Sequence, residues 1–294
     1  MKIAAFSDIH ANLPALEAVL EDIEKLGQDV QIVVAGDIVN CGPFPRETLS
    51  LVRALPNSHI IAGNHEEYVL EKKAAREGHQ EQELPVPYRA LFAPSTWTAS
   101  QLSAEELEWL ANLPRQSAFA GPGGSEVRVV HGSPRHQTEG LNNTLDEARL
   151  AEIFEKHTHP HTLWISGHTH FPAIVRWRGM TITNCGSAGA PYDGDTRACY
   201  LLAEWDERRS DWYVEHRRVE YNREEALAAI QRNAAYDQSG PFMRLIYQNL
   251  KLGRPCDLRG FVSKYVQRED FPAPPADFEH LDRAIDLHLA QFAA

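Results

Sequence analysis

The sequence predicts an α/β fold that contains parallel β-α-β units. In the first 65 residues, apolar runs at 2–6, 32–35 and 59–62 alternate with two stretches of helical periodicity. This alternation is typical of a parallel sheet. After residue 163, short strands joined by tight turns such as Arg178-Gly179 indicate antiparallel pairs. We therefore expect both kinds of strand pairing.

The first elements follow from local patterns. Residues 2–6 form an apolar run that predicts a buried strand. Asn12 can cap a helix whose apolar side chains recur at helical spacing until Gly27 ends it. Residues 45–55 predict a second helix between the strands at 32–35 and 59–62. The carboxyl ends of all three strands should meet at one edge of the sheet, where ligands gather in such folds.

Residues 66–115 interrupt this alternation of strands and helices. Residues 66–76 have a helical pattern, and residues 77–87 are polar and loop-like. Ser103 and Glu106 have the spacing of a capping box that begins another helix. We interpret the stretch as a helical cap inserted beside the site. The alternative is a surface excursion with no role in substrate binding.

The remaining elements divide into a strand-rich part and a helical part. Residues 117–120 and 126–130 predict a hairpin, 145–156 a helix and 163–165 a strand. Further strands are predicted at 173–177, 180–183, 199–205 and 212–219, and helices at 222–233, 242–250 and 277–292, with a proline-rich connector at 271–275. We predict a main domain over residues 1–220 and a helical extension over 221–294 that packs on it.

Composition limits the classes of function. The 294 residues carry 29 Lys and Arg against 41 Asp and Glu, a formal charge of 29 − 41 = −12. An acidic chain lacks the basic footprint of a duplex-nucleic-acid binder, and this charge counts against a nuclease. No stretch reaches the ~18 apolar residues of a membrane span. The chain begins in a strand rather than a signal peptide, and its four cysteines form no C-x-x-C, so we expect a cytoplasmic protein.

Five polar clusters each follow a predicted strand. Their side chains are Asp8 and His10, Asp37, Asn64 and His65, His131, and His168 and His170. With His65 set aside, seven side chains can bind a metal, too many for one tetrahedral ion and suitable for two ions that share a carboxylate. Their mixture of Asp, Asn and His favours Mn, Fe, Zn, Co or Ni over Mg.

The order of these clusters resembles the calcineurin-like metallophosphoesterase superfamily. The resemblance rests on Asp8-x-His10, Gly36-Asp37, residues 63–66, residues 130–132 and residues 167–170. More narrowly, residues 36–43, 131–135 and 184–189 resemble the bacterial branch related to diadenosine tetraphosphatases and small phosphodiesterases. The family resemblance implies a four-layer α/β/β/α sandwich of two packed mixed sheets.

The resemblance also implies roles for these residues. The first metal would take Asp8, His10, Asp37 and His170, and the second would take Asp37, Asn64, His131 and His168. Asp37 would bridge the ions, and a hydroxide between them would attack phosphorus. His65 matches a family histidine that is not a ligand and that assists the leaving oxygen as an imidazolium.

Three further residues complete the sequence-based site. Glu66 is our candidate to hold His65 protonated and oriented, Arg135 to contact phosphate or form a structural salt bridge, and Asn12 to support the site beyond its capping role. Many family members carry a second Asp at the position of Asn40, which argues against the protein-phosphatase branch.

The sequence thus predicts a metal-dependent phosphoesterase. We favour a phosphodiesterase or a dinucleoside-polyphosphate hydrolase acting on a small phosphorylated substrate such as a nucleotide. The alternatives are a phosphomonoesterase or protein phosphatase, and a catalytically silent scaffold on the same fold. The C-terminal helices are expected to pack on the sheet, close the site or form a homo-oligomer.

Overall fold

Two five-stranded sheets form the centre of the protein in the computed structural model, which describes residues 1–77, 86–157, 159–232, 242–256 and 278–292. The first sheet has the order β10-β9-β1-β2-β3. Its strands are β1 (Lys2–Phe6), β2 (Val30–Val34), β3 (Ser58–Ile60), β9 (Ala198–Asp206) and β10 (Asp211–Val219). Strands β1, β2 and β3 are parallel, whereas β9 and β10 pair antiparallel.

The second sheet has the order β4-β5-β6-β8-β7. Its strands are β4 (Gln116–Ala120), β5 (Glu126–Val130), β6 (Leu163–Ser166), β7 (Pro172–Trp177) and β8 (Met180–Cys185). Strands β5, β6 and β8 are parallel, and the β4-β5 hairpin and the β7-β8 pair are antiparallel. Both sheets are therefore mixed, as the family resemblance implied.

The sheets pack face to face with helices outside them, so the predicted four-layer sandwich is confirmed. Ile3 and Val33 of the first sheet share a buried apolar cluster with Val129 and Ile165 of the second. On its other face, the first sheet packs against α1 (Leu13–Glu24) and α2 (Pro45–Arg53). Helix α6 (Glu147–Phe154) covers the second sheet. Because β1 is buried on both faces, its residues read as one continuous apolar run.

The part of the chain that connects β3 of the first sheet to β4 of the second sheet is helical. It contains α3 (Asn64–Glu77), α4 (Val86–Gln101) and α5 (Ala104–Ala111). Ser103 and Glu106 form the predicted capping box at the start of α5. Helix α4 was not predicted, since Pro94 lies inside it and its apolar residues have no clear helical periodicity. Most of the predicted loop at 77–87 lies outside the described residues.

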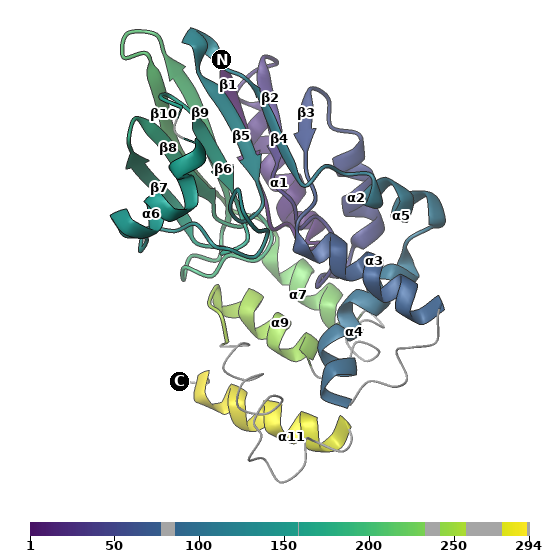
Figure 1. Cartoon of the computed structure of the whole chain (residues 1–294). Helices are drawn as coiled ribbons and strands as arrows, with labels where there is room; N and C mark the ends of the chain where they lie inside the picture. Colours follow the sequence, from purple (N-terminus) through teal and green to yellow (C-terminus); the bar gives the residue numbers. More distant parts are fainter. Residues whose placement is uncertain (78–85, 158, 233–241, 257–277, 293–294) are drawn as a thin grey trace.

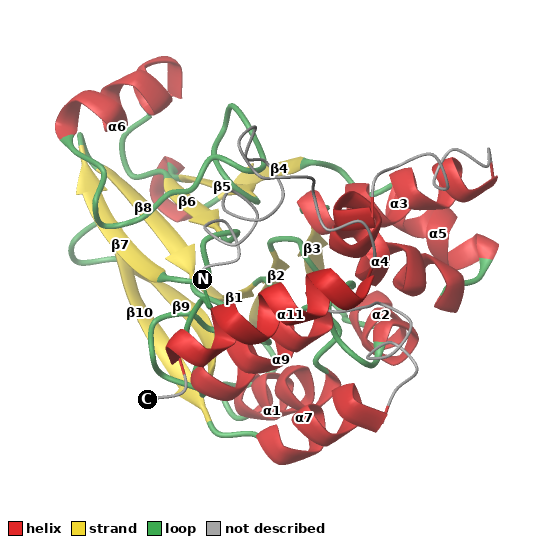
Figure 2. Ribbon diagram, turned by 90° about the horizontal axis from the view of Figure 1, so that it is seen from below, coloured by secondary structure: helices red, strands yellow, loops and turns green. Residues whose placement is uncertain are grey.

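Among the described residues, three helices follow the last strand: α7 (Arg223–Arg232), α9 (Phe242–Leu252) and α11 (Phe278–Leu289). Short 3₁₀ turns complete the described elements at Pro122–Gly124, Glu155–His157 and Ala290–Phe292. In Figure 1, α7 and α9 lie beneath the edge at which β1 and β2 end, beside α4. Seen from below, α9 and α11 lie in front of that edge (Figure 2). The predicted connector at 271–275 lies outside the described residues, and the division at residue 220 stays a prediction.

No helix within the described residues combines the length and the apolar character that crossing a membrane requires.

Candidate metal centre

The carboxyl ends of four parallel strands carry six of the predicted ligands to one place, and the seventh, Asn64, follows β3. Asp8 and His10 follow β1, Asp37 follows β2, His131 follows β5, and His168 and His170 follow β6. The backbone bends sharply there, because Asp8, His10, Asp37, His168 and His170 all have positive φ angles between 49° and 69°. Non-glycine residues rarely adopt this conformation, and such strain concentrates at functional sites.

One group of ligand atoms surrounds Asp8. The Nε2 atom of His170 lies 3.3 Å from Oδ1 of Asp8 and 3.1 Å from Nε2 of His10. The Asp8 carboxylate is fully buried and accepts hydrogen bonds from Ser7 Oγ at 2.6 Å and from the backbone N–H of His168 at 3.0 Å. These bonds orient the carboxylate toward the two histidines, and the three side chains form a compact group of metal-type ligands.

A second group surrounds Asp37. Its Oδ2 atom lies 3.2 Å from Nε2 of His131 and 3.8 Å from Nε2 of His10. The Oδ1 atom of Asn64 lies 3.1 Å from His131 Nε2 and 2.9 Å from Nδ1 of His168. Asp37 therefore stands between the two groups. All seven predicted ligands lie in this one cluster.

The ring orientations fit a metal. His131 Nδ1 donates to the carbonyl of Ala35 at 2.7 Å, and His170 Nδ1 donates to the carbonyl of Ala190 at 2.5 Å. Each bond fixes the tautomer and leaves Nε2 to face the centre, which is how metal-bound histidines are commonly held. The Nε2 atoms of His10 and His170 face each other at 3.1 Å, so one of them must accept a hydrogen bond from the other. A cation between these groups would satisfy both nitrogens.

The titration properties of the cluster agree with this donor chemistry. Burial disfavours a charged His131, yet Asp37 raises its pKa to about 10, so a proton occupies the place of a cation. Burial lowers the pKa of His10 to about 3, assisted by His65 and His170, which keeps the ring neutral. Burial opposes ionisation of Asp8, but His170 brings its pKa down to about 2. The carboxylates are thus charged and attract positive charge.

Two glycines make room for the carboxylates. A Cβ atom on Gly63 would overlap the Asp37 carboxylate, and one on Gly167 would lie 2.6 Å from Oδ2 of Asp8. Real Cβ atoms essentially never approach another atom so closely. The loops after β3 and β6 can therefore pass this close to the two carboxylates only because these positions are glycines.

His65 is held by Asn40. The Nδ2 atom of Asn40 lies 2.8 Å from Nδ1 of His65, and its Oδ1 accepts the backbone N–H of Cys41 at 2.9 Å. The backbone of His65 in turn donates to Oδ1 of Asp37 at 2.9 Å. Its ring lies edge-on to that of His10, with centroids 4.8 Å apart. His65 therefore borders the cluster without belonging to either group of ligands around Asp8 and Asp37.

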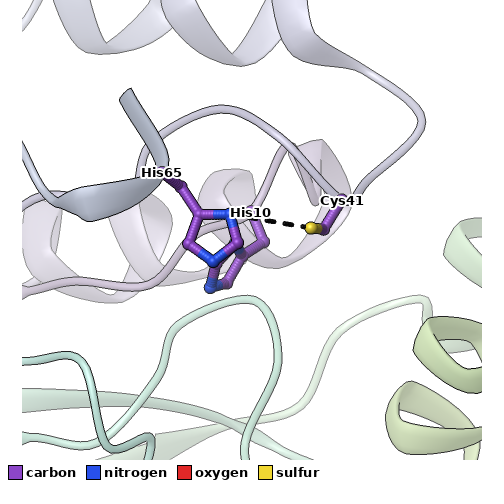
Figure 3. A group of neighbouring side chains, drawn as sticks. All are labelled: His10, Cys41 and His65. Atoms are coloured by element: carbon purple, nitrogen blue, oxygen red, sulfur yellow. Dashed lines mark hydrogen bonds between the residues drawn. The ribbon is translucent and has the colours of Figure 1, made fainter. Parts of the chain in front are cut away.

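Cys41 lies beside this pair, with Sγ 3.7 Å from Nδ1 of His65 (Figure 3). His10, Cys41 and His65 together bring three ligand-type atoms within 4.8 Å of one another. Burial, reinforced by Asp37, raises the pKa of the Cys41 thiol to about 12. The sulfur is therefore a protonated thiol at neutral pH, a poor metal ligand and a poor nucleophile.

The structure corrects the role predicted for Glu66. Its fully buried carboxylate accepts four backbone N–H groups, those of Asp37, Ile38, Val39 and Gly63, at 2.8–3.1 Å. The described partner that holds the His65 ring is Asn40, not Glu66. Glu66 therefore fixes the loop that carries Asp37. Residues 65 and 66 are adjacent in sequence, but their side chains make different contacts.

Asn12 and Arg135 are both engaged in structural contacts. Asn12 caps α1 through the backbone N–H of Ala15 and donates to the carbonyl of Gly189 at 2.8 Å. Arg135 pairs with Glu139 and with Glu152, so the structural salt bridge is the alternative that the geometry supports. Its side chain nevertheless lines a small cavity that also contacts Asn64 and His131.

The sequence interpretation missed two aromatic neighbours of the cluster. The Tyr192 ring stacks on His170 with centroids 4.2 Å apart, and Tyr68 lies edge-on to His65 at 5.4 Å. Neither tyrosine follows a strand or belongs to a motif, so no local signal marked them. Asn40 could have been found, because it occupies a position that usually carries an acid in the resembled family.

Comparison with known proteins agrees with this geometry. The family model described as the calcineurin-like phosphoesterase superfamily domain matches residues 1–208. The uncharacterized protein MJ0912 of Methanocaldococcus jannaschii is 31% identical over 246 residues, which cover 79% of this chain and 92% of that protein.

Two solved structures are also similar. The crystal structure of a metallophosphoesterase from Sphaerobacter thermophilus is 32% identical with a TM-score of 0.63, and the match covers 86% of this chain and all of that one. The hypothetical protein PH1004 from Pyrococcus horikoshii has a TM-score of 0.69 at 22% identity, covering 84% of this chain and 97% of that one, which supports the fold. The chain therefore belongs to the calcineurin-like phosphoesterase superfamily and is a hydrolase of phosphoester bonds.

Proposed function

We propose that the protein hydrolyses phosphodiesters at a centre of two divalent transition-metal ions. The observation that carries this proposal is the position of Asp37, whose Oδ2 lies 3.2 Å from His131 Nε2 and 3.8 Å from His10 Nε2. A carboxylate between two groups of ligands can serve both ions. Asp8, His10, Asp37 and His170 would hold the first ion, and Asp37, Asn64, His131 and His168 the second.

The ions would supply positive charge for the phosphoryl oxygens and lower the pKa of a water molecule that attacks phosphorus. The chain's own residues would do the rest. Asp8 and Asp37 are buried and ionised, so they hold the cationic charge in place. Burial lowers the pKa of His65, and Asn40 occupies its Nδ1, so its remaining N–H is on Nε2. That N–H would donate a hydrogen bond to the leaving oxygen.

The test is hydrolysis by the metal-stripped protein after resupply of Mn, Ni, Zn, Co, Fe or Mg. The substrates are bis(4-nitrophenyl) phosphate as a diester, 4-nitrophenyl phosphate as a monoester, and diadenosine tetraphosphate. We expect a transition metal to restore turnover of the diester. Asp37→Asn should lose bound metal, and His65→Ala should keep metal but lose at least about a hundredfold in kcat.

His159→Ala serves as a matched control, because His159 is exposed and hydrogen-bonds to Thr162. It should leave turnover unchanged. A chain that binds no metal would overturn the proposal. A chain that binds two ions and hydrolyses none of the three substrates would instead favour the scaffold alternative.

A further inference from the structure

A cavity of about 390 Å³ opens beside the metal centre, on the side of His10, His65 and His170. Its far walls come from α4, which belongs to the inserted segment between β3 and β4, and from α7 and α9, which belong to the C-terminal part after β10. The apolar side chains of these walls are Leu91, Phe92, Ile230, Leu245, Ile246 and Leu250. We call this space the apolar cavity. Its volume lies in the range of typical small-molecule sites, which is roughly 300–1,000 Å³.

The described residues that line the apolar cavity include no Asp, Glu, Lys or Arg. A second phosphoryl group would bring at least one more negative charge into this space. Burial of an unpaired charge among apolar side chains is strongly unfavourable. The cavity therefore suits an uncharged group and disfavours the polyphosphate chain of a dinucleoside polyphosphate.

The amide side chains at the cavity wall are already engaged. The amide of Asn12 donates to Gly189, and that of Asn40 donates to His65 and to Ser95. Oδ1 of Asn249 accepts the backbone N–H of Cys256 at 2.6 Å. Selective binding of a nucleobase or sugar requires polar groups of the protein whose hydrogen bonds are completed by the ligand. These amides are engaged within the protein, so the polar groups left at the wall are few, chiefly the hydroxyls of Tyr68, Ser95 and Tyr192, and most of the cavity surface is apolar.

A second cavity at the centre, of about 240 Å³, does not supply a free cation within the described residues either. It contacts Asn64 and His131 and is lined by Arg115 and Arg135. Arg115 pairs with Glu67 at 2.7 Å, and Arg135 pairs with Glu139 and Glu152. Both guanidinium groups are therefore neutralised by carboxylates of the protein.

We propose that the apolar cavity binds the leaving alcohol of the substrate, and that this alcohol is an uncharged apolar group. The inference rests on the proposed function, since it takes His65 as the donor to the leaving oxygen. His65 lines the apolar cavity, so an alcohol whose oxygen meets Nε2 of His65 extends into it. Water adds its oxygen to phosphorus, the bond from phosphorus to the alcohol oxygen breaks, and that oxygen takes up the proton that the water releases.

The first test uses methyl 4-alkylphenyl phosphates with methyl, propyl or pentyl at the 4-position. These phenols differ in size but hardly in acidity, so the chemical step stays constant across the series. We expect kcat/KM to rise about 15-fold from methyl to propyl, because each buried methylene contributes about fourfold. A rate that is independent of chain length, or diadenosine tetraphosphate as a tenfold better substrate than every ester, would overturn the inference.

The second test fills the cavity. Ile246 is half-buried on α9, and Ile246→Trp places an indole in the space that the alkyl chain would occupy. We expect the propyl-to-methyl ratio of kcat/KM to fall below threefold. Ile174→Trp, on the exposed face of β7, is the matched control and should keep the full ratio. Equal ratios in the two variants would contradict the assignment.

A binding measurement separates failure of this inference from failure of the proposed function. Calorimetry with 4-methylphenol, 4-propylphenol and 4-pentylphenol reports the cavity without any turnover. We expect the affinity to increase with chain length and to lose this dependence in Ile246→Trp. If the phenols bind in this manner and no ester is hydrolysed, only the proposed function fails. If the esters are hydrolysed and the phenols bind without regard to chain length, only this inference fails.

Discussion

Asn40 donates a hydrogen bond to Nδ1 of His65, and the direction of this bond is fixed by the backbone. The N–H of Cys41 can only donate, and it points at Oδ1 of Asn40, so the amide nitrogen must face the imidazole at 2.8 Å. An amide NH₂ group has no acceptor. Nδ1 of His65 is therefore unprotonated, and the ring is neutral with its proton on Nε2. This differs from the imidazolium that the resemblance implied.

Replacement of Asn40 by Asp should reverse this arrangement. A carboxylate there accepts from His65, Cys41, Ser95 and Thr98, all of which can donate, so Asn40→Asp should fold. We expect the pKa of His65 to rise by about one unit or more, because a carboxylate within hydrogen-bonding distance favours the charged ring. NMR titration of histidine-labelled protein measures the shift, with His65→Ala to assign the signal.

The control for charge alone is Asn112→Asp, which changes an exposed residue at the end of α5. It adds the same negative charge far from the ring and should leave the pKa of His65 unchanged. Equal titration curves for His65 in the wild type and in Asn40→Asp would show that the amide does not determine the tautomer.

Glu66 should prove essential for stability. In Glu66→Gln, an NH₂ group replaces an oxygen that accepts two backbone N–H groups, so two hydrogen bonds are lost and donors face each other. We expect the free energy of unfolding to fall by roughly 3 kcal/mol, since one hydrogen bond to a charged group contributes about 1.5–3 kcal/mol. Urea denaturation measures the change. Glu67→Gln should cost below about 1 kcal/mol, and a similar loss in both variants would refute this account.

The sequence predicted where the metal ligands lie better than it predicted which residues hold them in place. Asp8, Asp37, His131 and His170 follow parallel strands, and the strand ends of such sheets meet at one edge, so local pattern alone brought them together. Glu66 and Asn40 act across loops that are 25 to 29 residues apart. Such contacts depend on how the loops cross, which no periodicity records.

The apolar cavity could not be predicted from the sequence for the same reason, because it depends on contacts between elements that are far apart in the chain. The apolar positions of α7 and α9 indicated only that these helices bury something. Helix α9 packs on α4 and α7 packs on α9, so Ile230 and Leu245 line the same cavity as His65, and this requires contacts between the inserted segment and the C-terminal part. Helix α4 itself escaped prediction, because Pro94 interrupts its pattern. Cap segments of this kind vary independently of the fold that carries the ligands.

Arg135 should matter little for substrate affinity. Its guanidinium is about one-third exposed and pairs with the carboxylates of Glu139 and Glu152, which neutralise its charge. We expect Arg135→Ala to change KM for the diester by less than threefold and to have little effect on stability, since exposed ion pairs contribute little. Arg149→Ala, which removes the other arginine of the same cluster, should behave alike. A tenfold rise in KM for Arg135→Ala alone would restore its role as a phosphate ligand.

The metal-stripped protein should lose stability as the pH rises above neutrality. Burial opposes a charged His131, but Asp37 raises its pKa from 6.5 to about 10. A raised pKa contributes stability that is complete below pH 6.5 and is lost as the pH approaches 10. Chemical denaturation of EDTA-treated protein between pH 6.5 and 10 should therefore show a decline on the order of a few kcal/mol. In the metal-loaded protein an ion takes the place of this proton, and the decline should be much smaller. Equal slopes for the two forms would show that His131 does not exchange its proton for the metal.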